Sequence, residues 1–160
     1  MKSSTAERSV SFVDIEDVSF VKVRSGLDYW YRKRGTRRYP ARSDIEPSQI
    51  KALLPNVTLI RVLADGADYE FRIVGERTIE EHGTNPIHWH VSQLDSLVQG
   101  YGDFMRRLCD RVRSTGEPVV LRGSLHHVER GHRRYESIYL PLGVQAVDHI
   151  LNVADYMGAE

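Results

Sequence analysis

Two spacings of hydrophobic residues divide most of the chain into predicted helices and strands. In the clearest helical segment, 97–115, apolar side chains recur every three to four residues, and Gly116 is placed to end the helix. Three shorter helical segments are predicted, each ended by glycine or proline: 25–35, 47–54 and a turn that ends at Gly83.

Short runs of alternating or continuous apolar residues predict the strands. The first two strands flank an Asp-Gly turn and form a hairpin, and three more follow the long helix: 57–63, 69–74, 119–128, 135–142 and 147–153. Two strands, a helical crossing and three consecutive strands predict an α+β fold, in which a five-stranded antiparallel sheet carries helices on one face.

The N-terminal segment is more polar than the rest of the chain. Residues 1–8 are predicted to be a disordered tail, whereas the apolar residues between Val10 and Ile15 indicate either a short strand or a docking arm. The expected organisation is an N-terminal tail or arm, one folded domain with a helical extension at its start, and a C-terminal tail: 1–25, 26–155 and 156–160.

Composition narrows the class of protein. Of the 160 residues, 41% are hydrophobic and 28% are charged, as in an ordinary soluble globular domain. Basic and acidic residues number 22 each, so no net charge attracts nucleic acid or an acidic membrane. No apolar run approaches the roughly 20 residues that span a bilayer, and no signal peptide is recognisable. The single Cys109 excludes an internal disulfide, and we expect a cytoplasmic protein.

The order of residues between positions 29 and 55 is the most distinctive feature of the chain. An aromatic pair is followed by a basic stretch, an Asp-Ile-x-Pro helix start and a Leu-Leu-Pro end, and further markers lie between Tyr69 and Leu142. Together they resemble a bacterial, mainly alphaproteobacterial, family of PAS-like domains over roughly 27–153. The first markers are Tyr29, Trp30, Arg34, Gly35, Arg37, Pro40, Arg42, Asp44, Ile45, Pro47, Leu53, Leu54 and Pro55.

The resemblance implies a PAS fold and a role as a sensory or protein-interaction domain that is usually found alone. It implies no particular ligand. One segment departs from the family pattern: after Gly83, relatives usually carry a second glycine followed by arginine, whereas this chain has the bulky residues His88, Trp89 and His90.

A PAS ligand pocket lies between the sheet and the short helices. The resemblance therefore implies a set of apolar candidate pocket residues, which an ordinary core would also contain: Phe71, Ile73, Ile79, Phe104, Leu108, Ile138 and Leu140. His88 and Trp89 of the departing loop are further candidates. His126 is another, because adjacent strand residues point to opposite faces and either His126 or His127 must face inward.

Arg72 faces away from Phe71 and Ile73 on a regular strand. We expect it to pair with an acidic residue, since a buried arginine needs a partner. The alternative is that Arg72 anchors a carboxylate ligand.

His88 and His90 are also weak candidates for a metal site. Side chains at i and i+2 of a strand share a face and can bind one metal ion. The sequence offers no convincing third ligand, and such a pair more often belongs to an ordinary loop, although His82 could join the pair. A small metal-binding protein or metal-dependent enzyme is therefore an alternative function.

A basic stretch without any acidic residue follows the aromatic pair. It could contact phosphates, which makes a nucleic-acid-binding adaptor a second alternative. We favour a structural role, in which the arginines hold the N-terminal helices in place through Asp44, Glu46 or backbone carbonyls. The basic residues are Arg32, Lys33, Arg34, Arg37, Arg38 and Arg42.

No catalytic motif is recognisable in the sequence: a serine nucleophile elbow, a glycine-rich phosphate loop and a Cys-x-x-Cys pair are all absent. Cys109 lacks an activating base nearby in the sequence. We therefore expect a protein that is not an enzyme, and the sequence identifies no cofactor. The expected function is sensing or protein interaction in bacterial signalling, with a small ligand under the sheet or a signalling partner biasing a homodimer.

Overall fold

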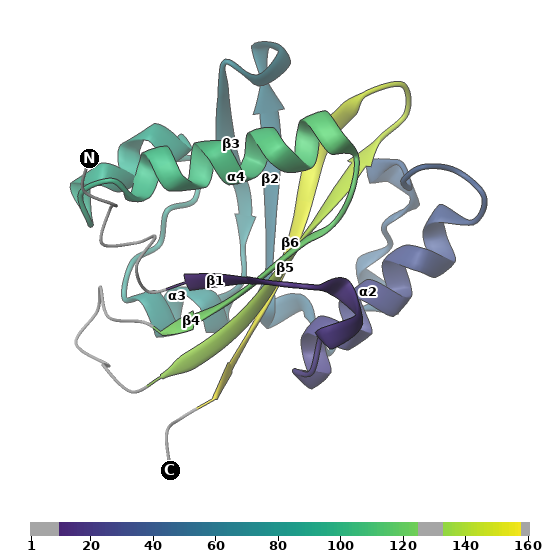
Figure 1. The fold of residues 1–160 in the computed structure, drawn as a ribbon, viewed down its shortest axis with the longest axis horizontal. Helices are drawn as coiled ribbons and strands as arrows, with labels where there is room; N and C mark the ends of the chain where they lie inside the picture. Colours follow the sequence, from purple (N-terminus) through teal and green to yellow (C-terminus); the bar gives the residue numbers. More distant parts are fainter. Residues whose placement is uncertain (1–9, 125–132, 158–160) are drawn as a thin grey trace.

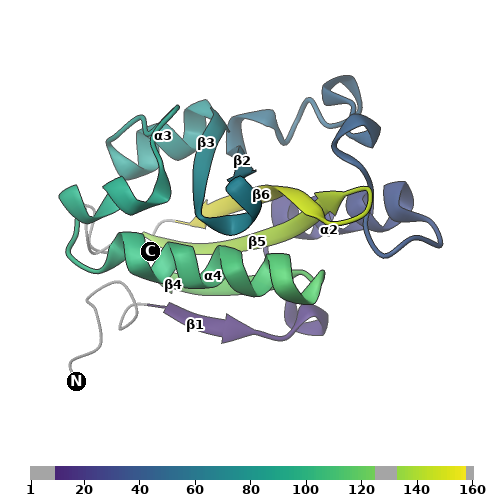
Figure 2. The same ribbon diagram turned by 90° about the horizontal axis from the view of Figure 1, so that it is seen from above.

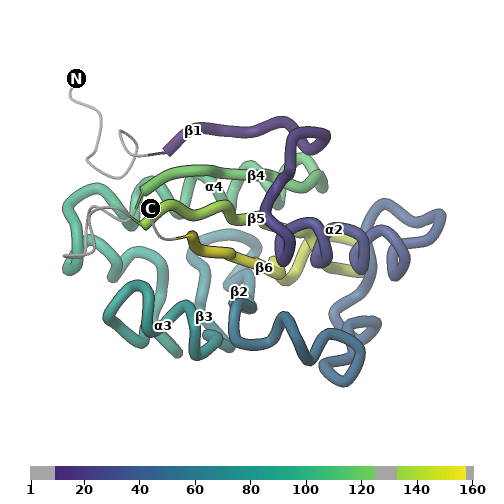
Figure 3. The backbone as a smooth tube through the Cα atoms, turned by 90° about the horizontal axis from the view of Figure 1, so that it is seen from below, coloured from purple at the N-terminus to yellow at the C-terminus, as the bar shows by residue number. Residues whose placement is uncertain are grey.

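A computed structural model of the protein describes residues 10–124 and 133–157, and it confirms the α+β class (Figure 1). Six antiparallel strands form one sheet in the order β1-β4-β5-β6-β2-β3, which can be followed across Figure 3. Five of them are the predicted strands. The sixth, β1, pairs with β4, so the apolar N-terminal segment is an edge strand of the sheet. The strands are β1 Val10–Val13, β2 Val57–Leu63, β3 Asp68–Val74, β4 Val119–Ser124, β5 Arg134–Gly143 and β6 Val147–Met157.

Among the described residues, three α-helices connect the strands: α2 Val21–Arg34, α3 Glu76–His82 and α4 Tyr101–Thr115. Helix α4 ends as predicted at Gly116, whose φ of 68° lies in the left-handed region that glycine adopts freely. It begins later than predicted, because Val91–Ser96 forms a separate 3-10 helix, η6, and Gly100, with a φ of 86°, interrupts the chain before α4.

Helices cover both faces of the sheet. Helices α3, η6 and α4 pack on one face of the sheet, which we call the inner face, and α2 packs on the opposite, outer face. Helix α4 is nearer the viewer in Figure 2, and α2 is nearer the viewer in Figure 3. Gly26 lets α2 approach β6, because a Cβ at this position would lie 2.9 Å from Val153 Cγ2. Trp30 is fully buried and donates its indole N–H to the Pro141 carbonyl at 2.9 Å. The central strands are therefore buried on both sides.

The segment 47–54, which the sequence predicts to be helical, is not an α-helix. It forms two 3-10 turns, Pro47–Gln49 and Leu54–Asn56, with a further turn between them. The amides of Gln49, Ile50 and Leu53 donate to carbonyls three residues earlier, as in 3-10 turns, and Pro55 disfavours a helical conformation of the residue before it. Ile50 and Leu53 are still buried, as the apolar spacing predicts.

Candidate functional site

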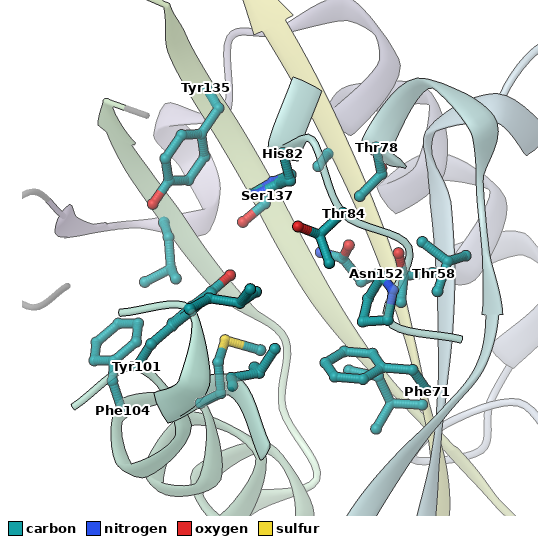
Figure 4. Close-up of a pocket in the computed structure, with 18 of the residues that line it drawn as sticks. Thr58, Phe71, Thr78, His82, Thr84, Tyr101, Phe104, Tyr135, Ser137 and Asn152 are labelled. Carbon is teal, nitrogen blue, oxygen red and sulfur yellow. The ribbon is translucent and has the colours of Figure 1, made fainter. Parts of the chain in front are cut away.

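A partly enclosed cavity of about 110 Å³ lies under the inner face of the sheet (Figure 4). Strands β2, β5 and β6 form one side of it, and α3, η6 and α4 form the other. An engineered cavity of about 150 Å³ in another protein binds benzene, so this volume suits a small molecule. It lies where a ligand site was expected, between the sheet and the short helices.

Strand β5 presents its odd-numbered residues to the cavity. Tyr135, Ser137 and Tyr139 line it, and their register partners on β6, Tyr156, Ala154 and Asn152, lie beside them on the same face. The predicted pocket residues Ile138 and Leu140 are fully buried but belong to the outer face of the sheet, which α2 covers. Sequence alone could not assign these faces, because eight consecutive β5 positions, from 136 to 143, are buried.

A β-bulge decides which residues of β3 reach the cavity. The register between β2 and β3 shifts between Leu59 and Ile60, and Phe71 and Val74 therefore both line the cavity. Ile73, which regular alternation places beside Phe71, is instead 47% exposed. Arg72 is also exposed and lies 3.6 Å from the Glu70 carboxylate, so it pairs with an acidic residue rather than facing the cavity.

Two helices complete the lining of the cavity. Thr78 and His82, one turn apart on α3, face it, whereas the predicted Ile79 is half-buried and does not line it. Helix α4 contributes Tyr101, Met105 and the predicted Phe104. Leu108, one turn further along α4, is buried in the core outside the cavity. Phe71 and Phe104 are thus the two predicted residues that the structure brings together here.

Ser137 is the polar residue that most needs a partner in this cavity. The residue is 3% exposed, and its hydroxyl oxygen makes no hydrogen bond within the described residues. The neighbouring Tyr139 phenol donates instead to the Met105 sulfur, a weak acceptor, at 3.9 Å. A buried hydroxyl without a partner costs free energy. A bound ligand or water that accepts from Ser137 would remove this cost.

Four tyrosines at the cavity remain protonated at neutral pH. Burial raises the pKa of Tyr101 to about 12. Burial is also the largest cause of the raised pKa values of Tyr135, Tyr139 and Tyr156, and the nearby Tyr101 phenol raises them further. The phenols are therefore neutral groups that can donate hydrogen bonds.

Replacing Ser137 with alanine should leave the free energy of unfolding of the ligand-free protein unchanged or raise it by up to about 1 kcal/mol, because the lost hydroxyl has no partner. Urea unfolding measures this. The matched control is Ser92→Ala, whose hydroxyl donates to Asp68 Oδ2 at 2.9 Å and whose loss should cost about 0.5–1 kcal/mol. A larger loss for Ser137→Ala than for Ser92→Ala would mean that the Ser137 hydroxyl is already satisfied.

The loop with His88, Trp89 and His90 lies outside the cavity. It extends the sheet beside β3, with the Phe71 N–H donating to the Trp89 carbonyl at 2.9 Å. Both histidines are exposed, and His90 Nδ1 lies 3.4 Å from Asp68. In the parts of the chain that the structure describes, no group of three or more His, Cys, Asp or Glu side chains could hold a metal ion. The predicted candidate His126 and its neighbour His127 lie outside the described residues.

The basic stretch is largely bound to the protein itself. Arg37 forms an ion pair with Asp44 at 2.9 Å, and the pKa of Asp44 is lowered by the Ala41 N–H and then by Arg37. Arg38 donates to the Thr115 carbonyl at 3.0 Å, and Arg34 stacks over aromatic rings of α2. These contacts match the structural role that the sequence favours for this stretch.

The outer face of β5 carries a buried carboxylate. Glu136, between Tyr135 and Ser137, is fully buried. It accepts hydrogen bonds from the backbone amides of Ser19 and Phe20 at 3.1 and 3.0 Å, and from Arg122 at 2.7 Å. Phe20 is the residue that precedes α2, so Glu136 holds the start of this helix. Sequence reasoning missed Glu136, although an acidic residue within an apolar strand indicates a paired charge.

A comparison with protein families finds one match along most of the chain. A family model described as a PAS domain matches residues 21–153. A search of curated proteins finds no match. Within the described residues, no helix combines the length and apolar character needed to cross a bilayer.

Proposed function

We propose, on the premise that this chain belongs to the PAS domain family, that it is a sensor which binds a small molecule in the cavity and signals through helix α2. Family membership makes it a sensory or interaction domain in general terms. The observation that carries the more specific proposal is the cavity itself, with a buried and unpartnered Ser137 hydroxyl in its lining. A packed core leaves few such groups, because each one costs stability.

Strand β5 connects the proposed ligand site with α2. Ser137 faces the cavity, and the adjacent Glu136 faces outward and binds the backbone at the start of α2. A ligand that moves or tightens β5 therefore acts directly on the position of this helix. Such a ligand shifts the population of α2 conformations only as far as it binds one of them better.

Helix α2 also offers a surface for a signalling partner or a second copy of the chain. Val21 is 76% exposed and Tyr31 is 39% exposed on this helix. Single exposed apolar side chains are common, but Val21 and Tyr31 lie on α2, the helix that Glu136 connects to the strand lining the cavity. The proposed output is thus a change in homodimer or partner contacts, and it requires no catalysis. No described feature favours the metal or nucleic-acid alternatives over this one.

Native mass spectrometry of untagged protein should show an added mass that is lost when the same sample is denatured. The physical reason is that a ligand held in a buried cavity dissociates when the fold opens. The variant Ser137→Leu places a branched side chain in the cavity and should lose the added mass. The matched control is Ser11→Ala, on the exposed part of β1, which should keep the added mass. A bare chain mass under both conditions would contradict the ligand-sensing proposal.

A further inference from the structure

We propose that the cavity selects an uncharged molecule about the size of one aromatic ring, which accepts hydrogen bonds from β5. This inference rests on the proposed function of the cavity as a ligand site. It adds the charge, the size and the hydrogen-bonding character of the ligand, each of which follows from a separate feature of the lining.

The ligand charge follows from the lining residues. Among those that the structure describes, there is no Asp, Glu, Lys or Arg. The nearby buried carboxylates are already used: Glu81 binds Arg77 and Arg133, and Glu136 faces the outer side of the sheet. His82 lines the cavity, but its ring packs edge-on against Tyr156, with the centroids 6.0 Å apart. A buried charge without a partner is strongly unfavourable, so the lining favours an uncharged ligand.

The hydrogen-bonding character follows from two donors on β5. The Ser137 hydroxyl makes no described hydrogen bond, and the Tyr139 hydroxyl donates to the Met105 sulfur, a weak acceptor, at 3.9 Å. The two hydroxyls lie close enough for Ser137 to lower the pKa of the Tyr139 phenol, which burial raises more strongly. Both face the cavity from positions two apart on one strand, which places their Cα atoms about 7 Å apart. Burial keeps the Tyr139 phenol protonated, because it raises the pKa of this group well above 10. A carbonyl, ether or ring nitrogen on the ligand would be a better acceptor than sulfur.

The size and the apolar body of the ligand follow from the opposite side of the cavity. Phe71 of β3 and Phe104 of α4 both line the cavity, and Figure 4 shows them across the space from the Ser137 side chain. Met105, beside Phe104, has an unbranched side chain that adapts to different shapes. The volume of about 110 Å³ is below that of the benzene-binding cavity, so the enclosed part holds at most one ring, and a short polar substituent lies in the open part of this partly enclosed cavity.

The test compares four ligands of nearly equal shape by isothermal titration calorimetry with the full-length protein at neutral pH. They are benzamide, benzoate, benzylammonium and toluene, which differ in charge and in the presence of an acceptor. We expect benzamide to bind, and benzoate and benzylammonium to bind at least about 100-fold more weakly, because no charge in the lining offsets their desolvation. Toluene should bind about tenfold more weakly than benzamide, because it leaves the donors on β5 unpaired.

Ser137→Ala should weaken the binding of benzamide about tenfold and leave the affinity for toluene unchanged, because only benzamide accepts a hydrogen bond from the Ser137 hydroxyl. Ser11→Ala should change neither. Equal or tighter binding of benzoate or benzylammonium overturns the inference on charge while the proposed function stands. Equal binding of toluene and benzamide, or an unchanged benzamide affinity in Ser137→Ala, overturns the role of β5 donors. Binding of none of the four by protein without retained ligand overturns this inference, whereas the native mass spectrum decides the proposed function separately.

Discussion

Replacing Glu136 with alanine should lower the free energy of unfolding by about 3 kcal/mol, the largest effect expected from a single carboxylate in this protein. Glu136 is fully buried, and its removal leaves the Ser19 and Phe20 amides at the start of α2 without an acceptor. It also removes the carboxylate partner of Arg122, whose side chain is 37% exposed, can partly regain water and also donates to Ser19 Oγ at 3.1 Å. We therefore expect a value at the low end of the range for a broken buried pair. Urea unfolding measures the change.

The matched control is Glu117→Ala, because Glu117 is exposed and its carboxylate makes no described contact. Its effect should stay within about 0.5 kcal/mol. Glu136→Gln keeps the shape of the side chain and one acceptor oxygen. Its loss in free energy of unfolding should therefore lie between those of the two alanine variants. Hydrogen exchange should show that α2 loses protection before the sheet does in Glu136→Ala. Equal stability losses in the two alanine variants would show that Glu136 does not hold the helix.

The sequence predicts the elements of this fold better than the faces of its strands. The five predicted strands and the caps of α3 and α4 are found because their signals are local: apolar runs, an Asp-Gly turn, and glycines at positive φ. The PAS resemblance then supplies the arrangement. Even so, the sixth strand could not be assigned with certainty, because Val10–Val13 is short and its pairing with β4 lies more than 100 residues away.

The candidate site depends on non-local facts, and it was therefore predicted only in part. Two of the apolar candidates, Phe71 and Phe104, line the cavity, but Ile138 and Leu140 lie on the other face. Alternation identifies an inner face only when the outer face is polar, and here α2 covers the outer face. The bulge in β3 has no recognisable sequence signal at Arg72, such as a glycine.

Polar lining residues were missed for a related reason. A search for apolar residues finds a core, whereas a ligand site within a core is marked by the polar residues that interrupt it. Ser137 and Asn152 are polar residues in the buried parts of β5 and β6, and both line the cavity. Glu136 interrupts β5 in the same way but faces α2. The sequence thus contains a usable signal, but the face of each residue decides its meaning.

Raising the pH above 10 should unfold the protein over a narrow range, between about pH 11 and 12. In the unfolded chain a tyrosine ionises near pH 10, whereas burial raises the pKa of Tyr101 to about 12 and holds those of four other tyrosines above their usual value. As the pH rises, the unfolded state therefore releases the tyrosine protons at a lower pH than the folded state does. Stability is complete below pH 10 and falls as the pH rises from 10 through the folded-state pKa values. The other four are Tyr69, Tyr135, Tyr139 and Tyr156.

Each of these tyrosines lowers stability by about 1.4 kcal/mol per pH unit in this range. Together the five approach the total stability of a typical domain, about 5–15 kcal/mol, within one or two units. The ultraviolet absorbance of tyrosinate and the circular dichroism of the backbone should consequently change together. Tyr101→Phe removes one titrating group and should reduce the slope by about a fifth, while lysine ionisation is common to both proteins. The chain has eight tyrosines, so three lie outside this set of five. If more than three tyrosinates form near pH 10 in a protein whose backbone signal is intact, phenols of the set are accessible to water, and the buried cavity on which ligand selection depends does not exist in solution.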